Sequence, residues 1–203
     1  MKNLCVTFEE WHIGDGTYPP LSKGQHVNLA FYIQPYEKTY TANSNYLLRP
    51  LKNSDYEFGG KIIRDYHDSD NRIIVVDTDS YLFYIEIADT DTANLAGQFV
   101  FGKGQLLIDY YIWAEYRCNY KNAPDLFYNF KVVKIRKVTI PEKFIHRHDS
   151  GFSAPTSLSP NDYGADDIEE IEDMNDQKND TSFFLLDLNP INDKIEKTWV
   201  SNG

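Results

Sequence analysis

The stretch "EFGGKIIRDYHDSDNRIIVVDTDSYLFYIEIAD", residues 57–89, decides the fold. It holds three apolar runs, at 62–66, 73–76 and 81–87, and the turn-forming segments "HDSDN" and "DTDS" separate them. Apolar residues at every second position, as in 81–87, are typical of β-strands. The pair Gly59-Gly60 before the first run predicts a bulge or a sharp bend. Three consecutive strands are therefore expected here, the first of them strongly bent.

The same alternation recurs along most of the chain. Strands are predicted at 4–8, 27–33, 106–115, 127–138 and 182–190, with a turn-rich connection at 14–25 and a polar loop at 36–56. The segment "GKGQ" at 102–105 is interpreted as a hairpin turn, because a phosphate-binding loop needs a following Ser or Thr and a helix. No helical periodicity is visible before residue 145.

Seven or eight short strands with almost no helix predict an all-β fold. The bent, glycine-marked strands favour a small Greek-key barrel of the OB or SH3-like kind, and a β-sandwich is the alternative. We expect residues 1–203 to form a single β domain. Residues 149–181, rich in Ser, Pro, Gly and Asp, are expected to form a flexible acidic loop before the C-terminal strand.

Charge is concentrated in one segment of the chain. The net charge is −11, from 31 acids and 20 bases, and "GADDIEEIEDMNDQKND" at 164–180 supplies eight acids and one base. The rest of the chain is therefore only mildly acidic, at −11 − (−7) = −4. No basic stripe of the kind that nucleic acid requires is visible, which disfavours DNA or RNA as a direct ligand. Ile168, Ile171 and Met174 recur within the acids at a spacing that predicts one amphipathic helical turn.

Residues capable of chemistry do not form a diagnostic catalytic or cofactor motif. His146 and His148 share one face of a short segment, but no second cluster completes a metal site. Cys5 and Cys118 occupy positions typical of small buried side chains in strands, and two thiols make no disulfide framework. We therefore expect no metal, no cofactor and no catalytic residues, and an enzyme is the less favoured class.

The location of the protein is predicted from its apolar segments. The N-terminal segment lacks the apolar core of a secretory signal, since Glu9 and Glu10 interrupt it at once. No window approaches the ~18 uninterrupted apolar residues of a membrane helix. These patterns predict a cytoplasmic protein that has no membrane partner.

Two functional hypotheses follow, beside the third possibility of a structural component. The first is a small soluble module that binds a basic protein, for instance a bacterial immunity or antitoxin-type inhibitor that neutralises a basic toxin by direct binding. Its predicted contact residues are the acids of the acidic segment and two nearby aromatic residues: Asp166, Asp167, Glu169, Glu170, Glu172, Asp173, Tyr163 and Phe152. The alternative is a ligand-binding or catalytic barrel with a pocket at Trp11, His12, Asp15 and His26.

Overall fold

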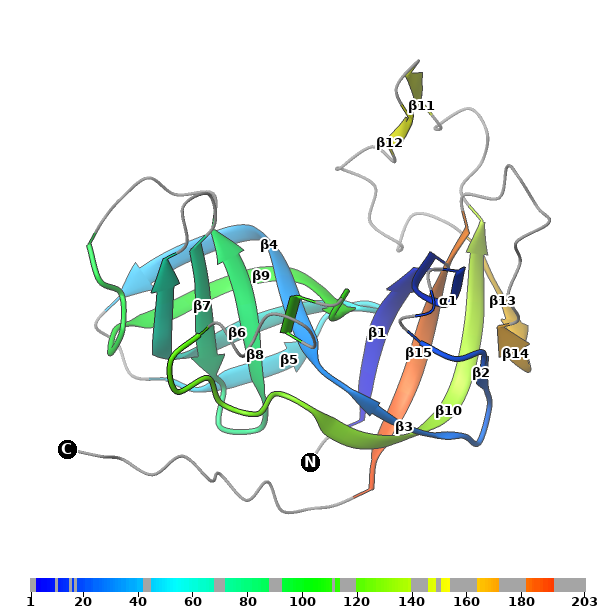
Figure 1. The fold of residues 1–203 in the computed structure, drawn as a ribbon, viewed down its shortest axis with the longest axis horizontal. Coiled ribbons are helices and arrows are strands. Elements are labelled where there is room, and N and C mark those ends of the chain that lie inside the picture. The colour runs from blue at the N-terminus through cyan, green and yellow to red at the C-terminus, as the bar shows by residue number, and fades with distance from the viewer. Residues whose placement is uncertain are drawn as a thin grey trace.

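The computed structural model describes the following residues: 3–9, 11–14, 16, 18–41, 45–67, 72–87, 93–110, 112–113, 120–139, 146–148, 151–153, 164–171 and 182–191. Almost all regular structure in these ranges is β, which confirms the all-β prediction. The exception among the assigned elements is the four-residue helix α1, Trp11–Gly14. Figure 1 shows a barrel on the left and a second twisted sheet on the right.

Five strands close the barrel (Figure 1). They are β4 (Phe31–Thr41), β6 (Asp55–His67), β7 (Arg72–Asp77), β8 (Leu82–Ile87) and β9 (Phe99–Ile108). Around the barrel the order is β4-β9-β6-β7-β8 and back to β4. Neighbours are antiparallel except β8 and β4, which meet as a parallel pair at Tyr32 and Tyr84. OB-type Greek-key barrels have this cyclic order and these directions, but here the strand β4 precedes the other four in the chain.

Strand β6 pairs with two different strands of the barrel along its length. Residues 55–61 pair with β9, residues 61–67 pair with β7, and the register shifts between Ile62 and Arg64. A Cβ atom added at Gly60 would lie 2.3 Å from the carbonyl oxygen of Asp77. The register irregularity therefore lies after Gly59-Gly60, which pair regularly with β9; Gly60 instead lets the β7 backbone approach β6 more closely than a side chain allows. The short strand β5, Leu47–Pro50, pairs with the free edge of β6.

The second sheet extends from the barrel through β1, Leu4–Glu9, which touches β9 at one parallel pair. β1 pairs with β15 (Ser182–Pro190), and β15 pairs with β10 (Tyr128–Thr139). Two short strands share the other edge of β10: β3 (His26–Leu29) near its start and β13 (Ala165–Ile168) near its end. The remaining pairs are β2 (Leu21–Ser22) with β14 (Glu170–Ile171), and β11 (His146–His148) with β12 (Gly151–Ser153).

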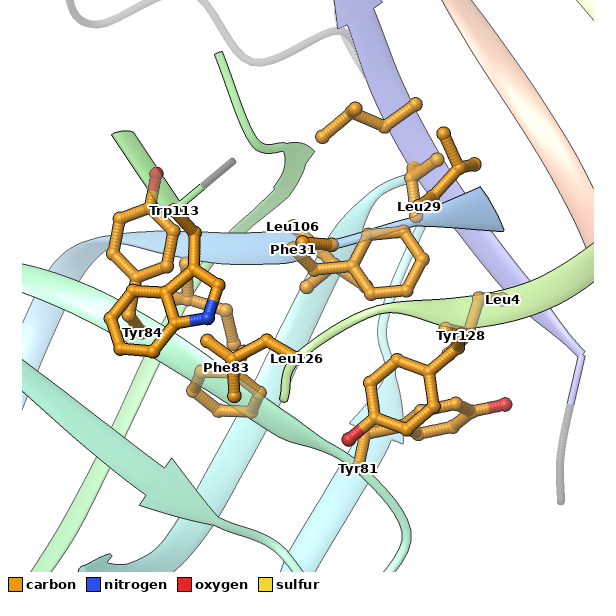
Figure 2. Close-up of a cluster of buried hydrophobic side chains, with 14 of the residues drawn as sticks. Leu4, Leu29, Phe31, Tyr81, Phe83, Tyr84, Leu106, Trp113, Leu126 and Tyr128 are labelled. Atoms are coloured by element: carbon orange, nitrogen blue, oxygen red, sulfur yellow. The ribbon is translucent and has the colours of Figure 1, made fainter. Parts of the chain in front are cut away.

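Aromatic side chains join the barrel to the second sheet. Tyr128 and Phe130 on β10 pack against Phe31 of β4 and Tyr81 at the start of β8, with ring centroids 5.3–6.4 Å apart. The hydroxyl of Tyr128 also accepts a 2.6 Å hydrogen bond from the Leu82 backbone N–H. Figure 2 shows Tyr81 and Tyr128 side by side within this cluster. The high tyrosine content therefore serves largely as core packing at this junction.

Sequence and structure differ at several strands. The predicted strand at 106–115 ends at Ile108, and residues 112–113 are helical; the predicted strand at 27–33 is divided at Ala30 between β3 and β4. The predicted polar loop at 36–56 contains the second half of β4 and all of β5, and residues 37–41 pair with β9 one by one. The predicted turn "GKGQ" lies in the middle of β9, paired to β4 on one side and β6 on the other. A Cβ atom at Gly102 would lie 2.1 Å from the Glu37 carbonyl oxygen. Gly102 is thus placed where two backbones approach closely, and the interpretation as a turn is wrong.

Candidate partner-binding surface

The described part of the acidic segment is a sheet edge. β13 pairs antiparallel with β10, and this register places Asp167 opposite Arg136 and Asp166 opposite Lys137. Residues 165–167, 169 and 170 are exposed. We call Asp166, Asp167, Glu169 and Glu170 the acidic edge. Its backbone is therefore held by strand pairing (Figure 1), while these residues are exposed to solvent.

The anchor of the acidic edge is apolar. Ile171 on β14 is 1% exposed and pairs with Leu21 of β2, which is also 1% exposed. The backbone N–H of Lys23 donates a 2.8 Å hydrogen bond to the Glu169 carbonyl. Burial of two aliphatic side chains stabilises the segment by roughly 1.5–3 kcal/mol each. The backbone that carries the carboxylates is therefore held in place, while the carboxylates themselves are exposed.

The basic strand β10 supplies counter-charges to the acidic edge. Its sequence "YNFKVVKIRKVT" contains four bases and no acid. Lys134 lies 2.9 Å from Asp167, and Lys23 lies 2.9 Å from Glu169, with side chains 43–79% exposed in both pairs. Exposed pairs of this kind contribute about 0–1 kcal/mol each. Opposite charges thus help to set the β10–β13 register but bind the acids only weakly.

The structure brings together four of the eight predicted contact residues. Asp166 and Asp167 lie on β13, Glu170 lies on β14, and Glu169 lies between these two strands. Phe152 belongs to β12, but its side chain lies outside the described residues, as do Glu172, Asp173 and Tyr163.

The helical turn predicted within the acids is wrong for residues 168–171. Ile168 ends β13 and Ile171 lies in β14, while Met174 lies outside the described residues. Pairing with β10 and β2 satisfies backbone groups that an isolated helical turn would leave to water. The isoleucines mark the buried face of an edge strand, a pattern too short to distinguish from a helical turn by spacing alone.

The alternative pocket near the Trp11–Asp15 turn is not assembled from described side chains. His12 is 2% exposed and packs between Phe8 and Tyr18, with ring centroids 5.2 and 5.7 Å away. His26 is exposed on β3. The side chain of Trp11 and the whole of Asp15 lie outside the described residues. His12 is therefore part of the hydrophobic core.

A pocket elsewhere is too small for an organic ligand. It lies between β5, the start of β1 and the turn before β8, and its cavity volume is about 10 Å³. That volume holds about one water molecule. Within the described residues no group of three His, Cys, Asp or Glu side chains is placed to bind a metal ion.

Cys5 is a free thiol on β1, beside Arg136 and Asp187. Arg136 donates a 3.1 Å hydrogen bond to the Cys5 Sγ and a 3.0 Å bond to the Asp187 carboxylate. Burial, and then the negative charge of Asp187, raise the pKa of Cys5 to about 12. The thiol is therefore protonated at neutral pH and is a poor nucleophile, as its strand position suggested.

The basic strand that pairs with the acidic edge was not among the predicted site residues. The signal for it was present: Lys131, Lys134, Arg136 and Lys137 follow one another without an intervening acid. The register that brings this strand to the acids joins residues about thirty apart, and spacing alone does not specify it.

Comparisons with known proteins leave the chain without a relative. No family model matches it, and no curated protein or solved structure is significantly similar to it. In the described part of the chain, no helix has the length and apolarity needed to cross a membrane.

Proposed function

We propose that the chain is a protein-binding module that docks a basic partner on the acidic edge. The observation that carries the proposal is the exposed row of carboxylates at Asp166, Asp167, Glu169 and Glu170, whose backbone is held on a sheet edge by buried Ile171. Fixed charges of one sign accelerate the association of an oppositely charged partner and orient it.

The ion pairs within the chain support this role. Lys134 and Lys23 are themselves exposed, so their bonds to Asp167 and Glu169 are weak and are readily replaced. Lysine or arginine side chains of a partner can take over the same carboxylates at little cost. Among the described strands β13 pairs only with β10, so its other side can offer backbone groups to an added strand, which is a common mode of peptide recognition.

The covered face of the barrel supports protein rather than nucleic acid as the ligand. OB barrels bind oligonucleotides on the face that corresponds here to the outer side of β7 and β8. In this chain Tyr84 and Val75 on that face are completely buried. Trp113 stacks on Tyr84 at 5.8 Å (Figure 2), and Tyr120 stacks on Trp113 at 5.9 Å. The segment after β9 therefore occupies the surface on which bases would stack.

A bacterial immunity or antitoxin-type inhibitor is the specific form of this proposal. A small module without catalytic groups, acting in the cytoplasm, needs only to occupy the basic active surface of a toxin. The chain itself contains an example of the complementary element, since the strand β10 carries four bases and places two of them, Arg136 and Lys137, opposite β13.

The test is capture of partners from a lysate of the source cell by the wild-type chain and two variants. Asp166→Asn/Glu170→Gln removes two exposed charges from the acidic edge. Asp79→Asn/Asp125→Asn removes the same charge from exposed sites elsewhere and is the matched control. We expect one basic protein, identified by mass spectrometry, to be retained by the wild type and the control. The first variant should not retain this protein, and raised salt should weaken the binding of this protein to the wild type. Retention that is the same for all three chains would contradict the proposal.

A further inference from the structure

Four charged side chains form a straight row across the barrel strands β4, β9, β6 and β5. Glu37 lies opposite Lys103, Lys103 opposite Glu57, and Glu57 opposite Arg49. Directly opposed residues in antiparallel strands share one face of the sheet. Lys103 and Glu37 are 3.0 Å apart, and Arg49 contacts Glu57. The four side chains are 30–62% exposed, so the row faces solvent.

The sign of the charge alternates along this row as −, +, −, +. An alternating row of even length is complementary to its own reverse. We propose that a second copy of the chain docks on this face, related by a two-fold axis that runs along the strands between β9 and β6.

The two-fold axis determines which charges meet. It reverses the row, so that Glu37 of each copy faces Arg49 of the other, and Lys103 faces Glu57. Adjacent strands are about 4.8 Å apart, and the axis therefore superimposes the four positions one on one. An axis along the row, by contrast, would set like charges opposite each other. The charge pattern thus selects one arrangement of the dimer, as an isologous interface requires.

Aromatic side chains flank the row; Tyr46 and Tyr36 are exposed, whereas Phe99 is 8% exposed and supports Tyr46 from below. Phe99, Phe101 and Lys103 alternate along β9 and so lie on the same face. Tyr46, 47% exposed, packs edge-on against Phe99 at 5.4 Å. Tyr36, 57% exposed, directly precedes Glu37. Tyrosines and half-buried apolar side chains around a few charges are typical of protein interfaces.

The ring of Phe101 lies over Gly59. A Cβ atom at Gly59 would be 2.2 Å from the Phe101 ring, so this ring covers the Gly59 backbone. Because glycine has no side chain, nothing from Gly59 stands between the Phe101 ring and a second copy. The two-fold axis passes close to Phe101 and brings the two rings of the dimer together.

This surface is separate from the acidic edge. The row lies on the barrel strands β4, β9 and β6 and on the neighbouring strand β5. The acidic edge lies on β13 and β14, beside the second sheet (Figure 1). The inference therefore does not rest on the proposed function.

Two charge-swap variants test the dimer without changing net charge. Glu37→Lys/Lys103→Glu reverses one ion pair, and Arg49→Glu/Glu57→Arg reverses the other. Each variant keeps its pair within the chain, but its row is no longer complementary to its own reverse. The two variants are complementary to each other, because the row of one is the opposite of the reversed row of the other. Circular dichroism and thermal unfolding show whether each variant folds like the wild type.

Sedimentation equilibrium measures the oligomeric state from about 1 μM to about 1 mM, a range that covers dissociation constants of ordinary homodimers. We expect a wild-type dimer, a dissociation constant at least about tenfold higher for each variant alone, and a heterodimer in their equimolar mixture. A wild type that remains monomeric over the whole range would overturn the inference. Variants that dimerise as the wild type does, or a mixture that fails to form heterodimers, would overturn it as well.

Discussion

Replacement of Arg72 by methionine should lower the free energy of unfolding, because Arg72 forms a buried ion pair with Asp65 in the barrel. The Arg72 guanidinium donates 2.9 and 2.8 Å hydrogen bonds to the two carboxylate oxygens of Asp65. Their side chains are 3% and 1% exposed. The Leu95 backbone N–H adds a 2.7 Å hydrogen bond to the same carboxylate. The pair therefore ties β6, β7 and the segment before β9 together.

The magnitude follows from what the substitution leaves behind. Arg72→Met fills a similar volume with an apolar side chain but strands the Asp65 carboxylate in a buried site. Removal of one partner from a buried ion pair costs about 3–5 kcal/mol. For a chain of 203 residues this corresponds to a fall in melting temperature of roughly 6–20 °C.

The loss should depend on pH in a defined direction. Burial acts to raise the pKa of Asp65, but hydrogen bonds from Arg72 and Leu95 and the charge of Arg72 outweigh it, so the pKa is lowered. A carboxyl with a lowered folded pKa contributes stability above its unfolded pKa of about 3.9 and loses it as pH falls through the folded pKa. Without Arg72, two of the effects that lower the Asp65 pKa are lost and burial should raise this pKa, although the Leu95 N–H and His67, 3.3 Å away, still oppose the rise. The difference in the free energy of unfolding between wild type and variant should therefore be smaller at pH 4 than at pH 7.

The assay is urea unfolding followed by tryptophan fluorescence at pH 7, 5.5 and 4, with Asp65→Asn/Arg72→Met as the control. The double variant removes the stranded charge and should recover part of the lost stability at pH 7. A cost below about 1 kcal/mol at pH 7 would place this pair in the range of surface pairs and refute the reasoning. A difference that is equal at pH 7 and pH 4 would refute it too.

Three other predictions concern single positions. Gly102→Ala should destabilise the chain by about 1–3 kcal/mol in thermal unfolding, because its Cβ would clash with a β4 carbonyl, whereas Gly164→Ala, with nothing within 4 Å, should cost under ~0.5 kcal/mol. Tyr84→Phe should cost about 1.5–3 kcal/mol in urea unfolding, since the hydroxyl donates a 2.6 Å hydrogen bond to a buried carboxylate; an unchanged midpoint would contradict this. In a Cys118→Ser background, Cys5 should resist alkylation at pH 8 until the chain is unfolded, because its pKa is about 12; rapid native labelling would show that its thiol is accessible and ionised.

Strands that contribute to the core were predictable from the sequence. β1, β7, β8 and β15 contain apolar residues that reach the core, and alternation, or the unbroken apolar run in β7, located each of them within a few residues. The segment that contains the acidic edge was also located, because the eight acids of residues 164–180 stand out from a nearly balanced chain.

Strands that pair without burying a face were not predictable. The second half of β4 is polar because its face meets solvent, and its strand state depends on β9, more than sixty residues away. β13 is a strand only because β10 lies beside it. The glycines of β9 were interpreted as a turn because close backbone approach depends on tertiary structure, and spacing carries no trace of it. The barrel order was likewise undetermined until the pairings were known.

The central claim is that the acidic edge binds a basic protein, and the most direct test is the affinity of the captured partner for three chains. Isothermal titration of that partner should give a dissociation constant at least about tenfold higher for Asp166→Asn/Glu170→Gln than for the wild type, and an unchanged constant for Asp79→Asn/Asp125→Asn. Equal affinity of all three chains for the partner would contradict the claim.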